Sequence, residues 1–449
     1  MVRAVVSARS RRRSGTAVTA ALGLLPALAL VAGVPGAAVA GPVPGPQPYR
    51  TAEGARAVEG KPSTDGAPLL EAGAFYEDTL APGERLYRLV LDDRSSAYVS
   101  AVMRPPAGAP IGYGDGVEVE IMTPEGRACP GNPGRASFGY DAVPLGAVGI
   151  RRLEEDAECQ RGGVYYAKVT RTAAKNGDRA AWPVELRFQR EPGLAGGNAP
   201  TTAPTAWPSA SPTLPGSEPV ARTGGTGFND ARALGPGVWR DELRPGQTRF
   251  YRVPLDWGQQ LGLGAELAAA RMTKTYGSAS GGLAVSVYSP YRGLVDDKDA
   301  SYDGKQAAVT LPRTAPVAYE NRYSSDTEDR AVRVAGWYYI AVTMGAKVGE
   351  FTEDATPVPL TLRLDVSGGP AKGPSYAESL TAAGFGVAAD DKAAARDGLT
   401  APEAAAAADD RAVLRVVAAA GFGTGTLLLA VWGGWLLLAR LRPGAGRAA

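Results

Sequence analysis

The chain of 449 residues contains no histidine and only two cysteines. Without an imidazole, a Ser-His-Asp triad, a Cys-His pair and a histidine-ligated zinc site are all excluded. No serine is followed three residues later by lysine, so the Ser-x-x-Lys arrangement of penicillin-binding enzymes is absent too. Carboxylates are the acid-base groups that remain, and we therefore do not expect an enzyme.

The chain also lacks a strong net charge, because 48 Lys and Arg residues stand against 46 Asp and Glu residues. A nucleic-acid-binding protein would carry a clustered basic excess, so we expect no nucleic-acid partner. No Walker or dinucleotide glycine pattern joins a strand to a helix, and no cofactor is expected from motifs. The abundance of Ala, Gly, Pro and Arg resembles proteins of GC-rich bacteria such as actinobacteria.

The two cysteines are Cys129 and Cys159, and both lie in the part that the chain's ends mark as exported. In an oxidising compartment an isolated pair most simply forms a disulfide. For a loop of this length, the bond would stabilise the fold by roughly 3 to 4 kcal/mol. Two free thiols are the alternative.

The N-terminus has the order of parts of a signal peptide. Five arginines without an acidic residue lie between Met1 and Gly15, and an apolar run follows from Ala17 to Val34. The small residues at 38–40 form an A-x-A site, which predicts cleavage between Ala40 and Gly41. An uncleaved N-terminal anchor is the alternative.

The C-terminus predicts a membrane helix. Val416 to Ala439 is uncharged, and about 20 residues suffice to cross the hydrocarbon core of a bilayer. Arg440, Arg442 and Arg447 follow without an acidic residue, which places the tail in the cytoplasm. The predicted localisation is the cell membrane, with a single pass, and the bulk of the chain lies outside the cytoplasm.

An internal repeat organises the exported part. Four segments recur in the same order, and a fifth, shorter one follows them. They are FYEDTLAPG (75–83) with VWRDELRPG (238–246), YRLVLD (87–92) with YRVPLD (251–256), VEVEIMTP (117–124) with LAVSVYSP (283–290), GVYYAKVT (163–170) with GWYYIAVT (336–343), and PVEL (183–186) with PVPL (357–360). The offset between the copies grows from 163 to 174, so insertions fall between the matched segments.

The repeated segments alternate apolar and polar residues, which is typical of strands with one buried face. Tyr87, Leu89 and Leu91 are expected to point inward and Arg88 outward. Pro-Gly pairs at 82–83 and 245–246 predict turns. Pro254 and Pro359 cannot donate to a ladder, so edge or bulged strands are expected there. The predicted fold class is mainly β, with two tandem antiparallel β-sandwich (jelly-roll-like) domains plus one C-terminal transmembrane helix.

These turn and strand motifs resemble those of the bacterial pre-peptidase C-terminal domain. The resemblance covers residues 70–191 and 232–367. It implies jelly-roll-like sandwiches that accompany secreted enzymes, bind substrate polymers or assist secretion, and in some members bind calcium. This chain has no attached enzyme domain, which leaves such an accessory role without its usual client.

The remaining segments complete the predicted organisation. The chain is divided into a signal peptide (1–40), a flexible lead (41–69), sandwich domains at 70–191 and 232–367, a Pro/Thr/Ser/Gly-rich linker (192–231), an Ala-rich juxtamembrane segment (368–415), the membrane helix (416–439) and a cytoplasmic tail (440–449). Thr400 and Glu403 have the spacing of a helix capping box.

Asp297, Asp299 and Asp303 are weak candidates for calcium ligands. They alternate along the chain as oxygen ligands do in a calcium loop, but the glycine at 304 and the missing glutamate exclude an EF-hand. A solvated acidic loop is the alternative. No catalytic residue is predicted.

The predicted function is a non-catalytic, membrane-tethered binding or assembly module of the cell envelope. It would recognise an envelope protein or a wall polymer. A carboxylate-based glycan hydrolase and a structural subunit of an envelope secretion or signalling complex are the alternatives.

Overall fold

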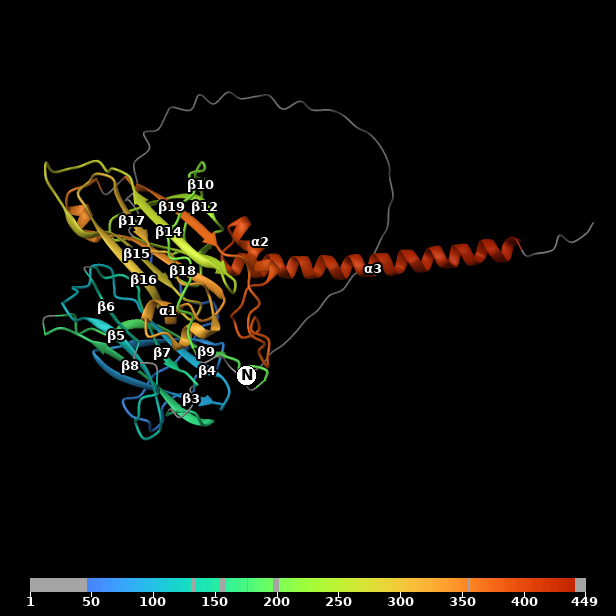
Figure 1. The fold of residues 1–449 in the computed structure, drawn as a ribbon, viewed down its shortest axis with the longest axis horizontal. Helices are drawn as coiled ribbons and strands as arrows, with labels where there is room; N and C mark the ends of the chain where they lie inside the picture. The colour runs from blue at the N-terminus through green and yellow to red at the C-terminus, as the bar shows by residue number, and fades with distance from the viewer. Residues whose placement is uncertain are drawn as a thin grey trace, which may run out of the picture. The chain divides into compact units, whose positions relative to one another are not determined.

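The computed structural model describes residues 47–130, 134–139, 141–153, 158–175, 177–196, 202–353 and 356–440. The predicted signal peptide lies outside these residues, with its cleavage site between Ala40 and Gly41, and so does the tail after Arg440. The described part is mainly β, with four sheets and few helices, as Figure 1 shows.

Residues 56–191 form the first β-sandwich, called sandwich 1, coloured blue to green in Figure 1. One sheet has the strand order β1-β2-β9-β4-β7 and the other β3-β8-β5-β6. Apolar side chains from both sheets meet in one core. The strands are β1 (Arg56–Ala57), β2 (Phe75–Leu80), β3 (Gly83–Leu91), β4 (Ser96–Met103), β5 (Gly116–Met122), β6 (Gly134–Ser137), β7 (Leu145–Arg151), β8 (Gly163–Thr172) and β9 (Trp182–Glu191).

Residues 220–367 form sandwich 2, with sheets ordered β10-β12-β19-β14-β17 and β11-β13-β18-β15-β16 around a second core. Three short helices, η1 (Tyr319–Tyr323), α1 (Thr327–Ala331) and η2 (Ala346–Glu350), lie in its connections. The strands are β10 (Val220–Ala221), β11 (Arg232–Ala233), β12 (Gly237–Leu243), β13 (Thr248–Leu255), β14 (Gln260–Leu267), β15 (Ala279–Tyr288), β16 (Leu294–Tyr302), β17 (Ala307–Leu311), β18 (Gly336–Met344) and β19 (Val358–Ser367).

The two sandwiches repeat one connectivity. The order 2-9-4-7 facing 3-8-5-6 recurs as 12-19-14-17 facing 13-18-15-16, which is the eight-stranded, two-sheet arrangement of a jelly roll. The alternation is confirmed, since Tyr87, Leu89 and Leu91 are buried while Arg88 is exposed. The period of two in the sequence therefore identifies the buried face of these strands correctly.

The structure corrects the register of the last repeated segment, which lies in β9 and β19. Phe75 pairs with Arg187, and its counterpart Val238 pairs with Arg363. Strands β9 and β19 therefore correspond at an offset of 176 residues (187 to 363). Pro183 therefore corresponds to Pro359. The short PVEL and PVPL segments had aligned through a different proline.

The prolines also differ from expectation. Pro359 is the second residue of β19, which is a central strand. The pairing of β19 with β14 begins one residue later, at Leu360. The missing N–H of Pro359 therefore breaks no ladder, which makes an edge strand unnecessary. Pro254 fits the expectation better, because the short β11 pairs with β13 only as far as Arg252.

Both sandwiches begin earlier than the sequence predicts. Asp78 accepts hydrogen bonds from the Tyr87 hydroxyl (2.7 Å) and the Gly60 amide (2.8 Å). In sandwich 2, Asp241 accepts the same two bonds from the Tyr251 hydroxyl (2.6 Å) and the Gly224 amide (2.8 Å). The repeat thus extends into the predicted flexible lead and the predicted linker, where the sequences had diverged too far to be matched.

The middle of the predicted linker packs along the outer face of β14. Glycines at 262 and 264 leave this face flat, and a Cβ at either position would lie within 2.5 Å of Pro212 or Leu214. The Gln260 amide donates to the Pro208 carbonyl, and Arg363 donates to the Pro215 carbonyl. Residues 207–215 therefore cover a sheet instead of forming a free spacer.

The predicted disulfide between Cys129 and Cys159 is confirmed, with Cα atoms 5.5 Å apart. It joins the chain after β5 to the chain before β8. Both cysteines are buried in the core of sandwich 1.

After β19 the chain crosses to the C-terminal helices. Residues 368–388, called the crossing segment, lead to α2 (Ala389–Asp397) and then to α3 (Ala401–Arg440). The predicted capping box is present, because the Thr400 amide donates to Glu403 at 2.8 Å and the Glu403 amide faces the Thr400 hydroxyl at 3.4 Å. Helix α3 starts where the sequence predicts.

The membrane helix predicted over Val416 to Ala439 falls within α3. In the described part of the chain, no helix has both the length and the apolar character that a membrane crossing requires. The side chains of residues 418–424, inside the predicted span, lie outside the described part.

The two sandwiches pack against each other. The outer face of the β9 sheet of sandwich 1 meets the outer face of the β18 sheet of sandwich 2, where Val102 contacts a group of aromatic side chains that includes Phe228 and Tyr288. Tyr98 stacks on Tyr291 with ring centroids 4.3 Å apart. The chain after β9, the crossing segment and the inter-sandwich face therefore lie close together.

Candidate binding site

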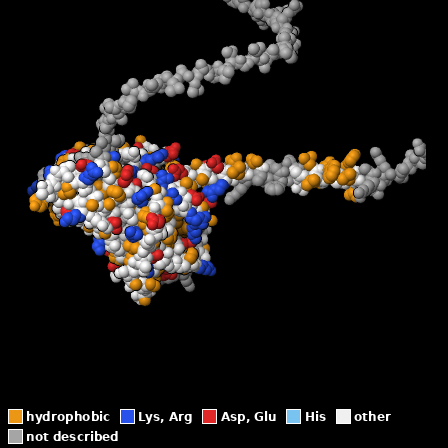
Figure 2. All heavy atoms as spheres, turned by 90° about the horizontal axis from the view of Figure 1, so that it is seen from above, with side chains coloured by type: hydrophobic (Ala, Val, Ile, Leu, Met, Phe, Trp, Pro, Cys, Tyr) orange, Lys and Arg blue, Asp and Glu red, His pale blue; other side chains and the backbone are white. Residues whose placement is uncertain are grey.

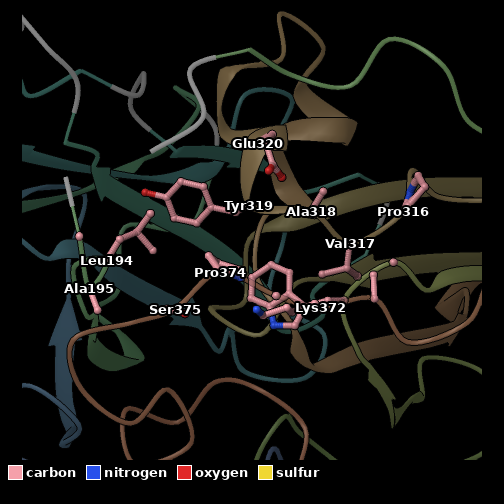
Figure 3. Close-up of a pocket in the computed structure, with 15 residues that line it drawn as sticks. Leu194, Ala195, Pro316, Val317, Ala318, Tyr319, Glu320, Lys372, Pro374 and Ser375 are labelled. Carbon is pink, nitrogen blue, oxygen red and sulfur yellow. The ribbon is translucent and has the colours of Figure 1, made fainter. Parts of the chain in front are cut away.

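A pocket of about 730 Å³ opens beside sandwich 2. Residues 194–196 after β9, residues 316–320 between β17 and β18, and residues 371–375 of the crossing segment form its walls, together with Trp257 and Gly258 after β13. Figure 3 shows the Tyr319 side chain reaching from its loop toward Leu194. Segments far apart in the sequence thus build one site.

Aromatic side chains give the pocket most of its flat surface. Trp257 and Tyr319 line it, and the ring of Tyr376 lies 6.4 Å from each of them by centroid distance. The Trp257 carbonyl accepts a hydrogen bond from the Ala371 amide at 2.7 Å, which joins the crossing segment to sandwich 2. Partly exposed aromatic rings of this kind are typical of contact residues in binding sites.

A buried carboxylate holds these rings in place. Glu191, at the end of β9, accepts hydrogen bonds from the Tyr98 hydroxyl (2.6 Å), the Tyr376 hydroxyl (2.8 Å) and the Arg322 guanidinium (2.7 Å). Arg322 also lies 3.4 Å from the Tyr319 ring centroid and donates to its carbonyl. The pocket wall is therefore connected to sandwich 1 through one hydrogen-bonded group.

Two members of this group, Arg322 and Tyr376, have shifted pKa values. Burial by itself lowers the pKa of Arg322, but the Glu191 carboxylate and the neighbouring tyrosines together outweigh burial and raise that pKa above its usual range. Burial, reinforced by Glu191, raises the pKa of Tyr376. Arg322 therefore stays charged and Tyr376 stays neutral at physiological pH.

The pocket combines aromatic surface with one charge of each sign. Its described lining contains a single carboxylate, Glu320, and a single amine, Lys372. Glycosidases place two carboxyl groups about 5 to 9.5 Å apart across the scissile bond. The described lining of this pocket therefore does not contain such a pair of carboxyl groups.

The calcium candidates lie elsewhere, and two of the three belong to a strand and not to a loop. Asp297 and Asp299 belong to β16, which pairs with β15 over most of its length, while Asp303 follows the strand and forms an ion pair with Lys305 at 3.6 Å. Burial, with Asp299 adding to it, raises the pKa of Asp297. Across the described residues, no group of three or more acidic or cysteine side chains could hold a metal ion.

Asp297 and Asp299 instead line a second, smaller cleft of about 370 Å³, which Asp141 of sandwich 1 also lines. Burial raises the pKa of Asp141, and its carboxylate accepts a hydrogen bond from the Ala346 amide at 3.2 Å. The sequence did not predict that residues of both sandwiches would meet here.

Three further aromatic residues of sandwich 2 lie outside the pocket. Trp239 belongs to the core of sandwich 2, and Tyr288 packs between the sandwiches. Trp337 is partly buried, its indole N–H donates to Asp391 of α2 at 3.0 Å, and Arg252 lies over its ring. All three are packing residues in this structure.

Two walls of the pocket lie where sandwich 2 departs from the repeat. Trp257 occupies the position of Asp93 in sandwich 1, since Tyr87 and Tyr251 correspond. The loop that carries Tyr319 is an insertion, because 24 residues separate β17 from β18 while 11 separate β7 from β8. Such differences between repeats are a sequence signal that could have identified the site.

Comparison with known proteins assigns the chain to no family. No known family matches the chain, and no curated protein matches it. Among solved structures, tripeptidyl peptidase 2 matches with 12% identity and a TM-score of 0.21, over 67% of this chain and 24% of that protein. This chain thus spans about a quarter of that protein's length.

Two further solved structures match with similar scores. The tandem CBM22-1–CBM22-2 domain of Paenibacillus barcinonensis Xyn10C has 14% identity and a TM-score of 0.17, over 66% of this chain and 92% of that one. The CUB1-EGF-CUB2 domain of human MASP-1/3 has 7% identity and a TM-score of 0.16, over 65% and 99%. None of these similarities identifies a pre-peptidase C-terminal domain, and that resemblance stays a prediction.

Proposed function

We propose that this protein is a non-catalytic binding or assembly module of the bacterial cell envelope, tethered to the membrane by its C-terminal helix. The aromatic pocket carries the proposal. It offers two ring faces, backbone groups and one charge of each sign, which are the groups that bind an extended polymer or a protein segment. The resemblance to pre-peptidase C-terminal domains agrees with this role.

The disulfide supports a location outside the cytoplasm. Structural disulfides persist in oxidising compartments, and the Cys129–Cys159 bond is buried in the core of sandwich 1. Export through the N-terminal signal peptide would deliver the sandwiches to such a compartment.

The exposed apolar side chains of α3 support the tether. Leu428 is 68% exposed and Trp432 is 62% exposed, and Figure 2 shows hydrophobic side chains gathering on the later part of this helix. Exposed apolar side chains of this kind mark interaction sites, and a lipid bilayer is the partner that the proposed tether requires. The arginines that follow orient the helix with its end in the cytoplasm.

Binding can be tested by sedimenting the purified full-length chain, in detergent, with purified cell-wall polymer. Tyr319→Ala and Lys372→Glu should each weaken binding at least about tenfold, or about 1.4 kcal/mol, because both residues line the pocket. Tyr276→Ala is the matched control, since Tyr276 is an exposed aromatic residue outside the pocket. Equal binding by all variants would contradict the pocket assignment.

Two further outcomes distinguish the alternatives. Release of reducing sugar ends from the polymer would replace the proposal with a glycan hydrolase. If the polymer does not bind, a photo-crosslinking residue at position 372 in living cells should trap one envelope protein, and Tyr319→Ala should abolish the crosslink while Tyr276→Ala should not. Absence of both binding and crosslinking would refute the module.

The tether is tested by replacing residues 416–439 with an unrelated membrane span. Membrane fractionation and function should survive this replacement, whereas deletion of the same residues should release the protein and abolish function. Full function of the released sandwiches would contradict the tether.

A further inference from the structure

The outer face of β9 carries a row of polar side chains that is buried between the two sandwiches. Glu185, Arg187, Gln189 and Glu191 alternate along this strand. The two ends of the row are neutralised by sandwich 2, because Arg292 pairs with Glu185 at 2.6 Å and Arg322 pairs with Glu191 at 2.7 Å. The middle of the row has no such partner among the described residues.

Three hydrogen-bond donors in the middle of the row are buried without an acceptor in the described part of the chain. They are the Arg187 Nε, the Gln189 Nε2 and the hydroxyl of Ser100, the residue directly opposite Arg187 on β4. Ser100 is 1% exposed and Gln189 is 2% exposed. A donor that is buried without an acceptor destabilises the fold, so each of these groups favours a bound acceptor.

Two of these side chains converge on the crossing segment. A Cβ added at Gly384 would lie 3.1 Å from Arg187 Nη2 and 3.6 Å from Gln189 Nε2. Gly384 has a φ of +82° and offers no side chain of its own. The guanidinium and the amide therefore both lie close to residue 384.

The same region has an excess of positive charge. Arg187 lies over the Phe75 ring at 4.9 Å, and neither a hydrogen bond nor an ion pair joins its guanidinium to a carboxylate in the described part. Burial, followed by repulsion from Arg292, lowers the pKa of Arg187 to about 10. Glu185 is nearby, but Arg292 and Asn229 already occupy its oxygens.

In sandwich 2 the side chains at the corresponding positions have partners. Arg363, the counterpart of Arg187, donates to the Pro215 carbonyl at 3.1 Å. Asp365 stands where sandwich 1 has Gln189, and it pairs with Arg313 at 2.9 Å. The repeat thus carries a carboxylate in one copy and a neutral amide in the other, beside the same arginine.

We propose that Arg187, Gln189 and Ser100 form a binding site for a small inorganic anion between the two sandwiches. The Arg187 and Gln189 nitrogens can only donate, and the hydroxyl can donate as well, so a ligand that only accepts satisfies all three. A negative charge also compensates the Arg187 guanidinium, which is partly buried and has no carboxylate partner among the described residues, whereas a neutral ligand does not. This site is independent of the pocket and of the proposed function.

Chloride is the probe. Thermal unfolding of the full-length chain in detergent is followed by tryptophan fluorescence while chloride replaces gluconate at constant ionic strength. The unfolding midpoint should rise with chloride and then saturate. At chloride concentrations 100 times the dissociation constant, the unfolding equilibrium constant should fall about 100-fold.

Three variants separate the site from general salt effects. Arg187→Met should remove the chloride dependence. Gln189→Glu should also remove the chloride dependence, because the new carboxylate takes the place of the anion. This variant should therefore be folded, and its unfolding midpoint should not depend on chloride. Arg363→Met, at the matching position of sandwich 2, should keep the wild-type response.

The proposal is overturned if chloride and gluconate give the same midpoint for the wild type, which would show that water satisfies these donors. It is also overturned if Gln189→Glu keeps the full chloride response, because the added charge would then not lie at the site. If Arg187→Met does not fold, Gln189→Glu decides the question alone.

Discussion

The two sandwiches share one connectivity but bury opposite outer faces. In sandwich 1 the β9 sheet is covered by sandwich 2, and the sheet that contains β8 keeps a charged outer face with an ion pair between Lys168 and Glu120. In sandwich 2 both sheets have a partner on their outer face. Its β18 sheet faces sandwich 1, and its β19 sheet is covered by residues 207–215 of the linker.

Single positions of the repeat show which residues allow the two sandwiches to bind different partners on the same face. Tyr98 and Ser100 on β4 correspond to Gly262 and Gly264 on β14, since they face counterpart residues of β9 and β19. The bulky Tyr98 stacks on Tyr291 of the other sandwich, whereas the glycines admit the linker. One fold thus accepts different partners on one face through side-chain size alone.

The largest effect is expected when a buried residue of sandwich 1 is replaced by its counterpart from sandwich 2. Val102 is fully buried between the sandwiches, and its counterpart in sandwich 2 is Glu266. Val102→Glu would bury an unpaired carboxylate beside Glu185, which should destabilise the protein by about 4 kcal/mol or more. Urea unfolding followed by fluorescence should then show two transitions in place of one.

Glu266→Val is the matched control for this change and should alter stability by less than about 1 kcal/mol, because residue 266 is only partly buried. A single unchanged transition for Val102→Glu would mean that the sandwiches do not stabilise each other.

The next effect concerns the disulfide, which lies in sandwich 1. Replacing Cys129 and Cys159 with serine should destabilise sandwich 1 by about 3 to 4 kcal/mol, because the 30-residue loop between them is no longer closed in the unfolded chain. Hydrogen exchange should report faster opening of β5 and β8, with β15 and β18 less affected. Equal acceleration in both sandwiches would show that they unfold only together.

The ion pair between the sandwiches predicts a pH dependence. Burial opposes ionisation of Glu185, but Arg292 and the hydrogen bonds to its carboxylate lower its pKa below the usual value. Its contribution to stability is therefore fully present above the unfolded pKa of about 4.3 and is lost as the pH falls below that value. Unfolding midpoints measured between neutral and acidic pH should fall more steeply for the wild type than for Glu185→Gln.

The smallest effect concerns the linker. Gly262→Ala would place a Cβ 2.4 Å from the Pro212 Cβ, and such overpacking costs about 1 to 3 kcal/mol. The linker should leave β14 before the sandwich unfolds, so limited proteolysis should cut faster within residues 203–219. Gly216→Ala, where an added Cβ meets nothing within 4 Å, should be cut like the wild type.

Much of the fold could be predicted from local patterns. Alternation identified the inward side chains of β3, the repeat predicted two similar sandwiches, and Thr400 with Glu403 fixed the start of α3. The pocket could not be predicted in this way. Trp257, Tyr319 and Lys372 are separated by more than 50 residues and come together only through the crossing segment.

The sequence by itself determined the strands, their buried faces and the cysteine pair, because these depend on residues close in sequence or on the only possible partner. The tertiary structure decided which outer faces are covered. The alternation on β9 marks Glu185, Arg187 and Gln189 as the polar face, and such a face is normally solvated. This face is buried here because Arg292 neutralises Glu185 and Arg322 neutralises Glu191. Each arginine lies more than 100 residues from its glutamate, so a local sequence pattern cannot predict these pairs.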